Sequence, residues 1–208
     1  MLHIETVEPG TFSLLKRLMT LQSLQPFSLV GGTALSLRYG HRSSIDLDLF
    51  YHEKFDHAVI EAELKQTFGD DFYYESGHKQ FGIFCYIEKV KVDIVYFPHL
   101  PIVEIEVEDN IRFYSSNDIG AMKIQAILGR GKKKDFWDLY ELFQHYSLQQ
   151  LMDWHHQKYP SQMLAISIPN ALSYFVEAEE TEEPRSFKNQ TWAGVKKGIM
   201  KVVRDYLK

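Results

Sequence analysis

The spacing of apolar residues predicts a strand-rich first part of the chain and a helical remainder. Residues 9–22 carry leucines and a methionine at helical spacing on one face, so they predict an amphipathic helix. Residues 33–39 and 54–68 predict two further helices. Short apolar or alternating runs predict strands at 27–30, 45–50, 71–75, 81–87 and 90–97, with one or two more within 102–114.

From Ser116 onward the apolar residues recur with a period of about 3.6, which is typical of helices, and 147–208 also looks helical. A group of glutamates before Pro184 predicts an exposed acidic loop, followed by a basic C-terminal helix. The glutamates are Glu177, Glu179, Glu180, Glu182 and Glu183. The pattern predicts an α+β fold, with a mixed sheet in residues 1–115 and a helical part in 116–208.

The composition is that of an ordinary folded protein and narrows the classes of function. The 208 residues include 23 Lys+Arg and 28 Asp+Glu, which gives a net charge of −5. The single cysteine, Cys85, excludes an intramolecular disulfide framework and a cysteine-rich zinc module. No apolar run reaches the roughly 20 residues that span a bilayer. The first residues lack the pattern of a signal peptide, so we expect a cytoplasmic protein.

Acidic residues stand inside two predicted strands, where they are unfavourable. Asp46 and Asp48 alternate with apolar residues, so both carboxylates point to one face and repel each other unless a cation intervenes. Asp93 lies in an otherwise apolar strand and joins them if the two strands are neighbours. Three carboxylates suit Mg²⁺, and two such ions can activate a hydroxyl and hold a leaving pyrophosphate. The alternatives are a solvated edge strand for the pair, and an ion pair with Lys91 or an arginine for Asp93.

A glycine turn stands just upstream of these carboxylates. Gly31 and Gly32 end a predicted strand and precede a helix, so backbone N–H groups at the helix start can approach an anion closely. Thr33 adds a hydroxyl donor. This arrangement predicts a phosphate cradle beside a metal-binding strand. The alternative is an ordinary tight turn.

Together these motifs resemble the catalytic pattern of the polymerase-β-type nucleotidyltransferase superfamily. The segments 30–35 and 40–50 are similar to one branch, the AbiEii/AbiGii toxin family of nucleotidyltransferases. A second match follows in the predicted helices, at 121–123, 130–131 and 134–140, where the family has its Lys and Lys-Asp motifs. The resemblance covers about residues 25–145. The wider superfamily usually has serine where this chain has Thr33, which keeps the hydroxyl.

The resemblance implies a nucleotidyltransferase-like mixed sheet with flanking helices and a helical C-terminal part. It implies Mg²⁺-dependent transfer of a nucleoside monophosphate from an NTP to an acceptor hydroxyl, on RNA and in some members on a tRNA 3′ end; a protein acceptor is the alternative. It further implies a toxin of a toxin–antitoxin or phage-defence system, with a nearby antitoxin that acts without a lasting complex. Two other hypotheses are an inactive nucleotide-binding interaction module and a plain RNA-binding factor that uses the basic C-terminal helix.

The resemblance also assigns roles to residues. Asp46, Asp48 and Asp93 would hold the Mg²⁺, with two ions expected, and Lys123 would lie near the triphosphate. Asp135 would contact the nucleotide or the region of the acceptor hydroxyl. The residues expected to bind the nucleotide are Gly31, Gly32, Thr33, Arg42 and Lys134.

Four of the charged residues also have interpretations that need no ligand. Lys123 lies on an apolar helix face. Its ammonium group either pairs with an anion such as a triphosphate, or reaches solvent because the side chain extends. Arg42 can bind a phosphate with two hydrogen bonds or pair with a nearby acid. Asp135 can stabilise a helix N-terminus. Lys134 belongs to a basic cluster, and such clusters generally form exposed turns.

Overall fold

The computed structural model describes residues 1–74 and 80–208, and within them one mixed sheet of seven strands runs in the order β3-β4-β5-β2-β1-β7-β6. The strands are β1 (Ser28–Val30), β2 (Leu47–Tyr51), β3 (Phe72–Tyr74), β4 (Gly82–Ile87), β5 (Val90–Tyr96), β6 (Glu106–Glu108) and β7 (Ile111–Phe113). Each predicted strand run therefore contains a strand. Residue 75, the last of the run 71–75, lies outside the described residues.

The centre of the sheet brings distant parts of the chain together. Strand β2 runs antiparallel to β1 and parallel to β5, and β5 continues through a tight turn from the antiparallel β4. Alternation explains the two faces of β5: Val92 and Ile94 are fully buried, whereas Lys91 and Asp93 lie on the opposite face. The expectation that strands 45–50 and 90–97 are neighbours is confirmed.

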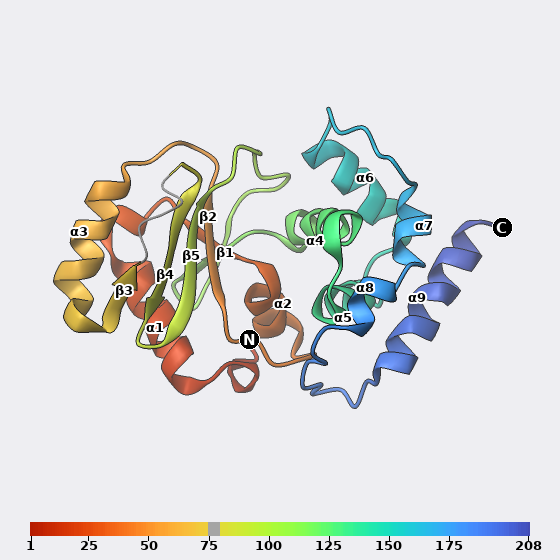
Figure 1. Cartoon of the computed structure of the whole chain (residues 1–208), viewed down its shortest axis with the longest axis horizontal. Coiled ribbons are helices and arrows are strands. Elements are labelled where there is room, and N and C mark those ends of the chain that lie inside the picture. The colour runs from red at the N-terminus through yellow and green to blue at the C-terminus, as the bar shows by residue number, and fades with distance from the viewer. Residues whose placement is uncertain (75–79) are drawn as a thin grey trace.

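Helices cover both sides of the sheet (Figure 1). Helices α1 (Pro9–Thr20) and α3 (His57–Phe68) lie on one side, and α2 (Gly31–Tyr39) lies between the sheet and the C-terminal helices. Helix α2 begins directly at the glycine turn, two residues earlier than predicted, because Gly31 takes a φ of +73° that turns the chain out of β1. It ends at Gly40, whose φ of +63° is the usual left-handed end of a helix.

The remainder of the chain is helical, as its 3.6-residue period predicts. Its helices are α4 (Ser116–Arg130), α5 (Lys133–Leu142), α6 (Leu148–Lys158), α7 (Ile168–Leu172), α8 (Val176–Glu179) and α9 (Trp192–Tyr206). The acidic segment is not the plain loop that its charge predicts. Its first part forms α8, and Glu179 accepts hydrogen bonds from Trp192 Nε1 (2.8 Å) and Lys196 Nζ (2.5 Å) of α9.

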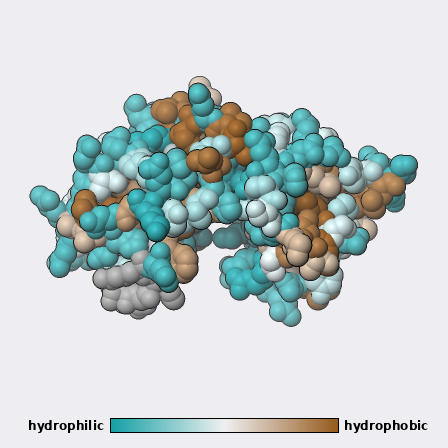
Figure 2. Space-filling view, turned by 90° about the horizontal axis from the view of Figure 1, so that it is seen from above, coloured by the Kyte–Doolittle hydropathy of each residue, from teal (hydrophilic) through white to brown (hydrophobic). Residues whose placement is uncertain are grey.

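A continuous hydrophobic core joins the sheet to the helices that follow it. The space-filling view shows the surface hollowed between the strand-bearing half and the helical half (Figure 2). None of the helices among the described residues is both long enough and apolar enough to cross a membrane.

Candidate active site

Two of the three predicted metal ligands stand side by side on the sheet. Asp48 of β2 and Asp93 of β5 are register partners on parallel strands, so their side chains share one face. Val30, the last residue of β1, pairs with Asp48 from the other side. The glycine turn that follows Val30 therefore lies next to the carboxylates.

Burial and mutual repulsion disfavour a charge on Asp48. Burial and then the nearby Asp93 carboxylate raise the pKa of Asp48 from 3.8 to about 6, although Lys91 and Lys123 act in the opposite direction. Asp93 Oδ2 contacts Lys91 Nζ, so the ion pair considered as an alternative for Asp93 is present. The other oxygen, Asp93 Oδ1, is buried and has no hydrogen-bond partner among the described residues. A buried carboxylate oxygen without a partner is the feature that a bound cation would satisfy.

The third carboxylate is held differently. Asp46 precedes β2 by one residue, and its Oδ2 lies 3.4 Å from Lys134 Nζ of α5. The described residues hold no group of three or more His, Cys, Asp and Glu side chains placed to bind a metal ion. As the side chains stand, Lys134 and Lys91 provide the positive charge that partners Asp46 and Asp93.

The two glycines allow protein groups to approach each other closely. A Cβ on Gly31 would lie 2.5 Å from Asp48 Oδ2, and a Cβ on Gly32 would lie 2.1 Å from Arg42 Nη2. Thr33 is buried, and its hydroxyl donates to the backbone carbonyl of Asp46 and lies 2.8 Å from the Ser44 hydroxyl. The turn thereby positions the acidic strand. The sequence predicted a phosphate cradle here and did not predict this positioning role.

Arg42 forms the ion pair that was the alternative to phosphate binding. Its Nε and Nη2 donate to the two oxygens of Asp138 at 2.7 and 2.8 Å, and its Nη1 donates to the Ser43 carbonyl at 2.8 Å. Only 3% of Arg42 is exposed. With its guanidinium engaged on both sides, Arg42 is a structural residue here and not an open phosphate ligand.

Lys123 also finds its anionic partners within the protein. Its ammonium group lies 2.8 Å from Asp135 Oδ1 and 2.7 Å from Asp138 Oδ2, in a buried position. Burial alone would lower the pKa of Lys123, but the two carboxylates outweigh burial and raise it. Asp135 also accepts a hydrogen bond from the Lys132 N–H at 3.1 Å, so it stabilises the start of α5. These two carboxylates balance the positive charge of Lys123, so neither solvent nor a nucleotide is needed for this.

Asp138 is the centre of this buried network, and the sequence interpretation did not include it among the site residues. It binds Arg42, Lys123 and His41, whose Nε2 lies 2.8 Å from Asp138 Oδ1. Burial would raise the pKa of Asp138, but the two cations and their hydrogen bonds hold it well below its ordinary value. The available signal was its position three residues after Asp135, which places both carboxylates on one face of α5.

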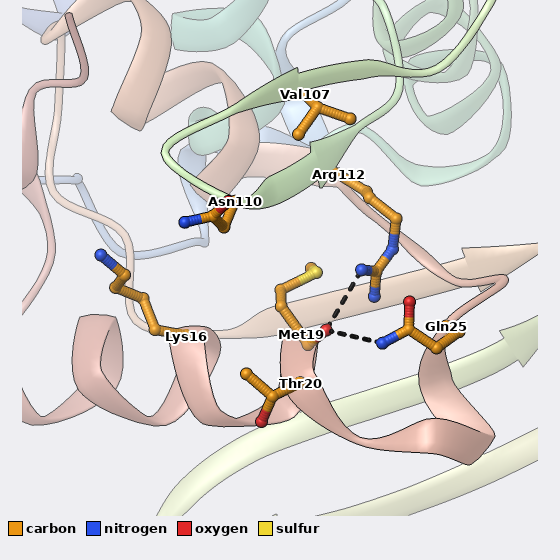
Figure 3. Close-up of a pocket in the computed structure, with 7 residues that line it drawn as sticks. All are labelled: Lys16, Met19, Thr20, Gln25, Val107, Asn110 and Arg112. Atoms are coloured by element: carbon orange, nitrogen blue, oxygen red, sulfur yellow. Dashed lines mark hydrogen bonds between the residues drawn. The ribbon is translucent and has the colours of Figure 1, made fainter.

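One pocket of the described residues lies away from the predicted site. A cavity of about 600 Å³ opens between the end of α1 and the β6–β7 hairpin (Figure 3). Arg112 crosses it and donates to the backbone carbonyls of Met19, Leu24 and Phe27 at 2.8 to 3.1 Å, so this guanidinium is used structurally. The pocket is lined by Lys16, Met19, Thr20, Gln25, Val107, Asn110 and Arg112, none of which is a predicted site residue.

The family model described as "Nucleotidyl transferase AbiEii toxin, Type IV TA system" matches residues 13–205. The chain belongs to the AbiEii nucleotidyltransferase toxin family. It is 32% identical over 200 residues to an uncharacterised protein of Aquifex aeolicus, covering 93% of this chain and 94% of that one. The resemblance drawn from the glycine turn and the acidic strands is therefore confirmed, and the protein is a nucleotidyltransferase.

Solved structures confirm the nucleotidyltransferase-like fold. JHP933 from Helicobacter pylori aligns with a TM-score of 0.60 at 18% identity, over 95% of this chain and 92% of that one. MenT4, a nucleotidyltransferase toxin from Mycobacterium tuberculosis, aligns with a TM-score of 0.54 at 14% identity, over 93% of this chain and 84% of that one. These likenesses show that the shared fold includes the helical half of the chain.

A C-terminal segment of this AbiEii family member braces the loop before β2. Phe187 donates its backbone N–H to the His41 carbonyl, and Ser43 donates its N–H to the Arg185 carbonyl, both at 2.9 Å. Arg42 and Ser186 form the isolated antiparallel bridge between them. Residues 185–187 therefore fix the loop that carries Arg42 and leads to Asp46.

Proposed function

We propose that this protein transfers a nucleoside monophosphate from an NTP to a hydroxyl group of RNA, with Mg²⁺ bound at Asp46, Asp48 and Asp93. The observation that supports it most directly is the pairing of Asp48 with Asp93 on neighbouring strands beside the glycine turn. Two neighbouring carboxylates in a half-buried place repel each other, and a cation bound between them would offset this repulsion.

The residues present fit such a cation. Asp48 and the unpartnered Asp93 Oδ1 would provide hard oxygen ligands, and Asp46 would complete the set when Lys134 releases it. When bound, Mg²⁺ would neutralise charge on the phosphates and favour the deprotonated acceptor hydroxyl. The protein's own contribution is positioning: the turn at Gly31 and the Thr33 hydroxyl hold the acidic strand in place.

Lys134 is the residue best placed to bind the triphosphate. Its side chain is 45% exposed and already lies at the carboxylates, and a triphosphate would offer it a stronger anionic partner than Asp46. The buried pair of Lys123 and Asp135 holds the start of α5 and thus positions Lys134. On this basis residues 1–115 supply the catalytic carboxylates, and residues 116–208 supply the nucleotide contact.

A plain RNA-binding factor built on α9 has less support. The lysines in α9 and just after it are partly neutralised, since Lys196 pairs with Glu179 at 2.5 Å, and Lys201 and Lys208 pair with Asp205 at 2.9 and 3.0 Å. Intrahelical and exposed pairs of this kind reduce the positive field that a phosphate backbone would meet.

The test is label transfer from each of the four α-³²P-NTPs to total cellular RNA, with Mg²⁺ and with EDTA. We expect transfer by the wild-type protein with Mg²⁺ and a loss of at least about 100-fold in the variant Asp93→Asn. The variant Asp70→Asn changes an exposed aspartate outside the site and is the matched control. Equal labelling by the wild type and Asp93→Asn contradicts the role proposed for Asp93. No labelling by either contradicts the proposal and favours the inactive binding module.

The family description also supports a biological role. We propose that expression of the wild type, and not of Asp93→Asn, halts growth, and that a separately encoded antitoxin opposes this effect. Sequencing the labelled RNA 3′ ends distinguishes tRNA from other RNA acceptors. Label recovered in protein instead of RNA would redirect the proposal to a protein acceptor.

A further inference from the structure

Lys91 holds a place at the candidate site to which the proposed function gives no role. It lies on β5 two residues before Asp93, so alternation puts both side chains on the face of the sheet that carries Asp48. Its ammonium group contacts Asp93 Oδ2, and its side chain is 41% exposed although the strand around it is largely apolar. Lys91 therefore keeps a cation at the carboxylates that we expect to bind Mg²⁺.

The charge of Lys91 acts on all three carboxylates. Asp46 and Lys91 each come one residue before the first register pair of β2 and β5, so Lys91 lies near Asp46 as well as Asp93. Burial alone would lower the pKa of Lys91, but Asp93, and then Asp48 and Asp46, outweigh burial and raise it. The group of carboxylates thus shares this cation.

A second lysine approaches the same group from the helical half of the molecule. Lys134 Nζ of α5 lies 3.4 Å from Asp46 Oδ2, and its side chain is 45% exposed. Two ammonium groups therefore stand among three carboxylates and neutralise most of the negative charge that would attract a divalent cation. A metal ion that enters here meets two positive charges together with its ligands.

We propose that Lys91 exchanges partners when substrate binds: it neutralises Asp93 until an NTP arrives and then binds the triphosphate, which frees the carboxylate for Mg²⁺. The inference rests on the proposed function, because it assumes an NTP and Mg²⁺ at these residues. Lys134 exchanges in the same way at Asp46. Metal and nucleotide then favour each other's binding, since the triphosphate draws the lysines away from the metal ligands and the metal neutralises the carboxylates that repel the triphosphate.

The side chain of Lys91 suits such an exchange. A lysine ammonium group is a point charge with three donors on a flexible stem, so it can turn from a carboxylate to a phosphate without movement of the backbone. Arg42, by contrast, is 3% exposed and is fixed on Asp138, and Lys123 is buried between two carboxylates. Of these four cations, Lys91 and Lys134 are the two that a ligand can recruit from solvent.

The experiment measures metal binding and phosphate binding separately, without turnover. Binding of Mn²⁺ to the full-length protein is followed by electron paramagnetic resonance without nucleotide. Binding of inorganic tripolyphosphate, which has no base, is followed by isothermal titration calorimetry in EDTA. Lys91→Met keeps most of the stem and removes the charge, so we expect it to bind Mn²⁺ at least about 5-fold more tightly than the wild type, and tripolyphosphate at least about 5-fold more weakly.

Three further variants serve as comparisons. Lys91→Arg keeps the charge and should bind Mn²⁺ no more tightly than the wild type. Lys65→Met changes an exposed lysine of α3 outside the site and is the matched control, so it should alter neither affinity. Lys134→Met should weaken tripolyphosphate binding. Circular dichroism confirms that each variant is folded.

Unchanged or weaker Mn²⁺ binding by Lys91→Met overturns the proposal, because Lys91 then does not compete with the metal. Tighter Mn²⁺ binding by Lys91→Arg also overturns it, because the charge of Lys91 is then not what opposes the metal. Unchanged tripolyphosphate binding by Lys91→Met overturns it too, and a loss in Lys134→Met alone would then assign the triphosphate to α5.

RNA labelling separates this inference from the proposed function. If the wild type labels RNA while Lys91→Met binds both ligands like the wild type, the proposed function stands and the exchange is wrong. If the wild type labels nothing while Lys91→Met shifts the two affinities in opposite directions, the proposed function fails. The exchange then stands for a site that binds metal and phosphate without turnover.

Discussion

Replacing Asp48 by asparagine should stabilise the metal-free protein at neutral pH while removing its activity. In the folded protein the pKa of Asp48 is raised to about 6 from 3.8, with burial as the larger cause and Asp93 as the second. A pKa raised on folding means that the protonated group contributes stability below about pH 4, which is lost as the pH rises through 6. The difference between pKa values of 3.8 and about 6 corresponds to about 3 kcal/mol at most, because the carboxyl is partly solvated.

An asparagine side chain cannot ionise, so the Asp48→Asn variant should keep what the wild type loses. We expect its free energy of unfolding to exceed that of the wild type by about 1–3 kcal/mol at pH 8, and by little at pH 4.5. The assay is urea unfolding in EDTA at several pH values, with the exposed Asp70→Asn as the control. Added Mg²⁺ should stabilise the wild type and the Asp70→Asn control but not Asp48→Asn. A variant that is less stable at pH 8, or a gain that does not change with pH, would refute the idea that Asp48 carries an unfavourable charge.

Three further outcomes are expected. Asp138→Asn should lower the free energy of unfolding by about 3–5 kcal/mol, because it leaves the buried Arg42 without a carboxylate partner, and the exposed control Asp153→Asn should change it by less than about 0.5 kcal/mol, both measured by urea unfolding. Gly31→Ala should destabilise the fold by at least about 1 kcal/mol and reduce label transfer, since alanine is strained at a φ of +73° and its Cβ would meet Asp48; wild-type activity would contradict this. The thiol of Cys85 is buried and its pKa is raised to about 12, so iodoacetamide should label it only in denaturant, and rapid labelling of the folded protein would show that the core opens.

Local patterns were enough to predict the strands and the strand positions of the acidic residues, because alternation and helical periods depend only on neighbours in the sequence. The adjacency of Asp48 and Asp93 was expected only if their strands are neighbours, which local patterns do not decide and which the pairing of β2 with β5 confirms. The partners of Arg42 and Lys123 could not be foreseen in the same way. Asp138 lies 96 residues after Arg42, and no local pattern distinguishes it from a phosphate as the anion that neutralises the pair.

The roles of the glycines were hidden for a related reason. A pair of glycines indicates that something approaches the backbone closely but not what approaches it. In the structure Asp48 and the guanidinium of Arg42 occupy those places. The charge of the acidic segment before Pro184 predicts exposure. It does not predict the contacts of Glu179 with Trp192 and Lys196, because these two residues belong to a helix further along the chain.

The bridge between Arg42 and Ser186 bears on how the protein is made. During translation the glycine turn and the acidic strands leave the ribosome long before residues 185–187 do, so the loop ahead of Asp46 lacks its brace until that segment has emerged as well. A ribosome that stalls or terminates early on this message therefore releases a polypeptide whose carboxylates are present but loosely held. With the toxic role proposed above, such a dependence delays full activity until residues 185–187 have been made.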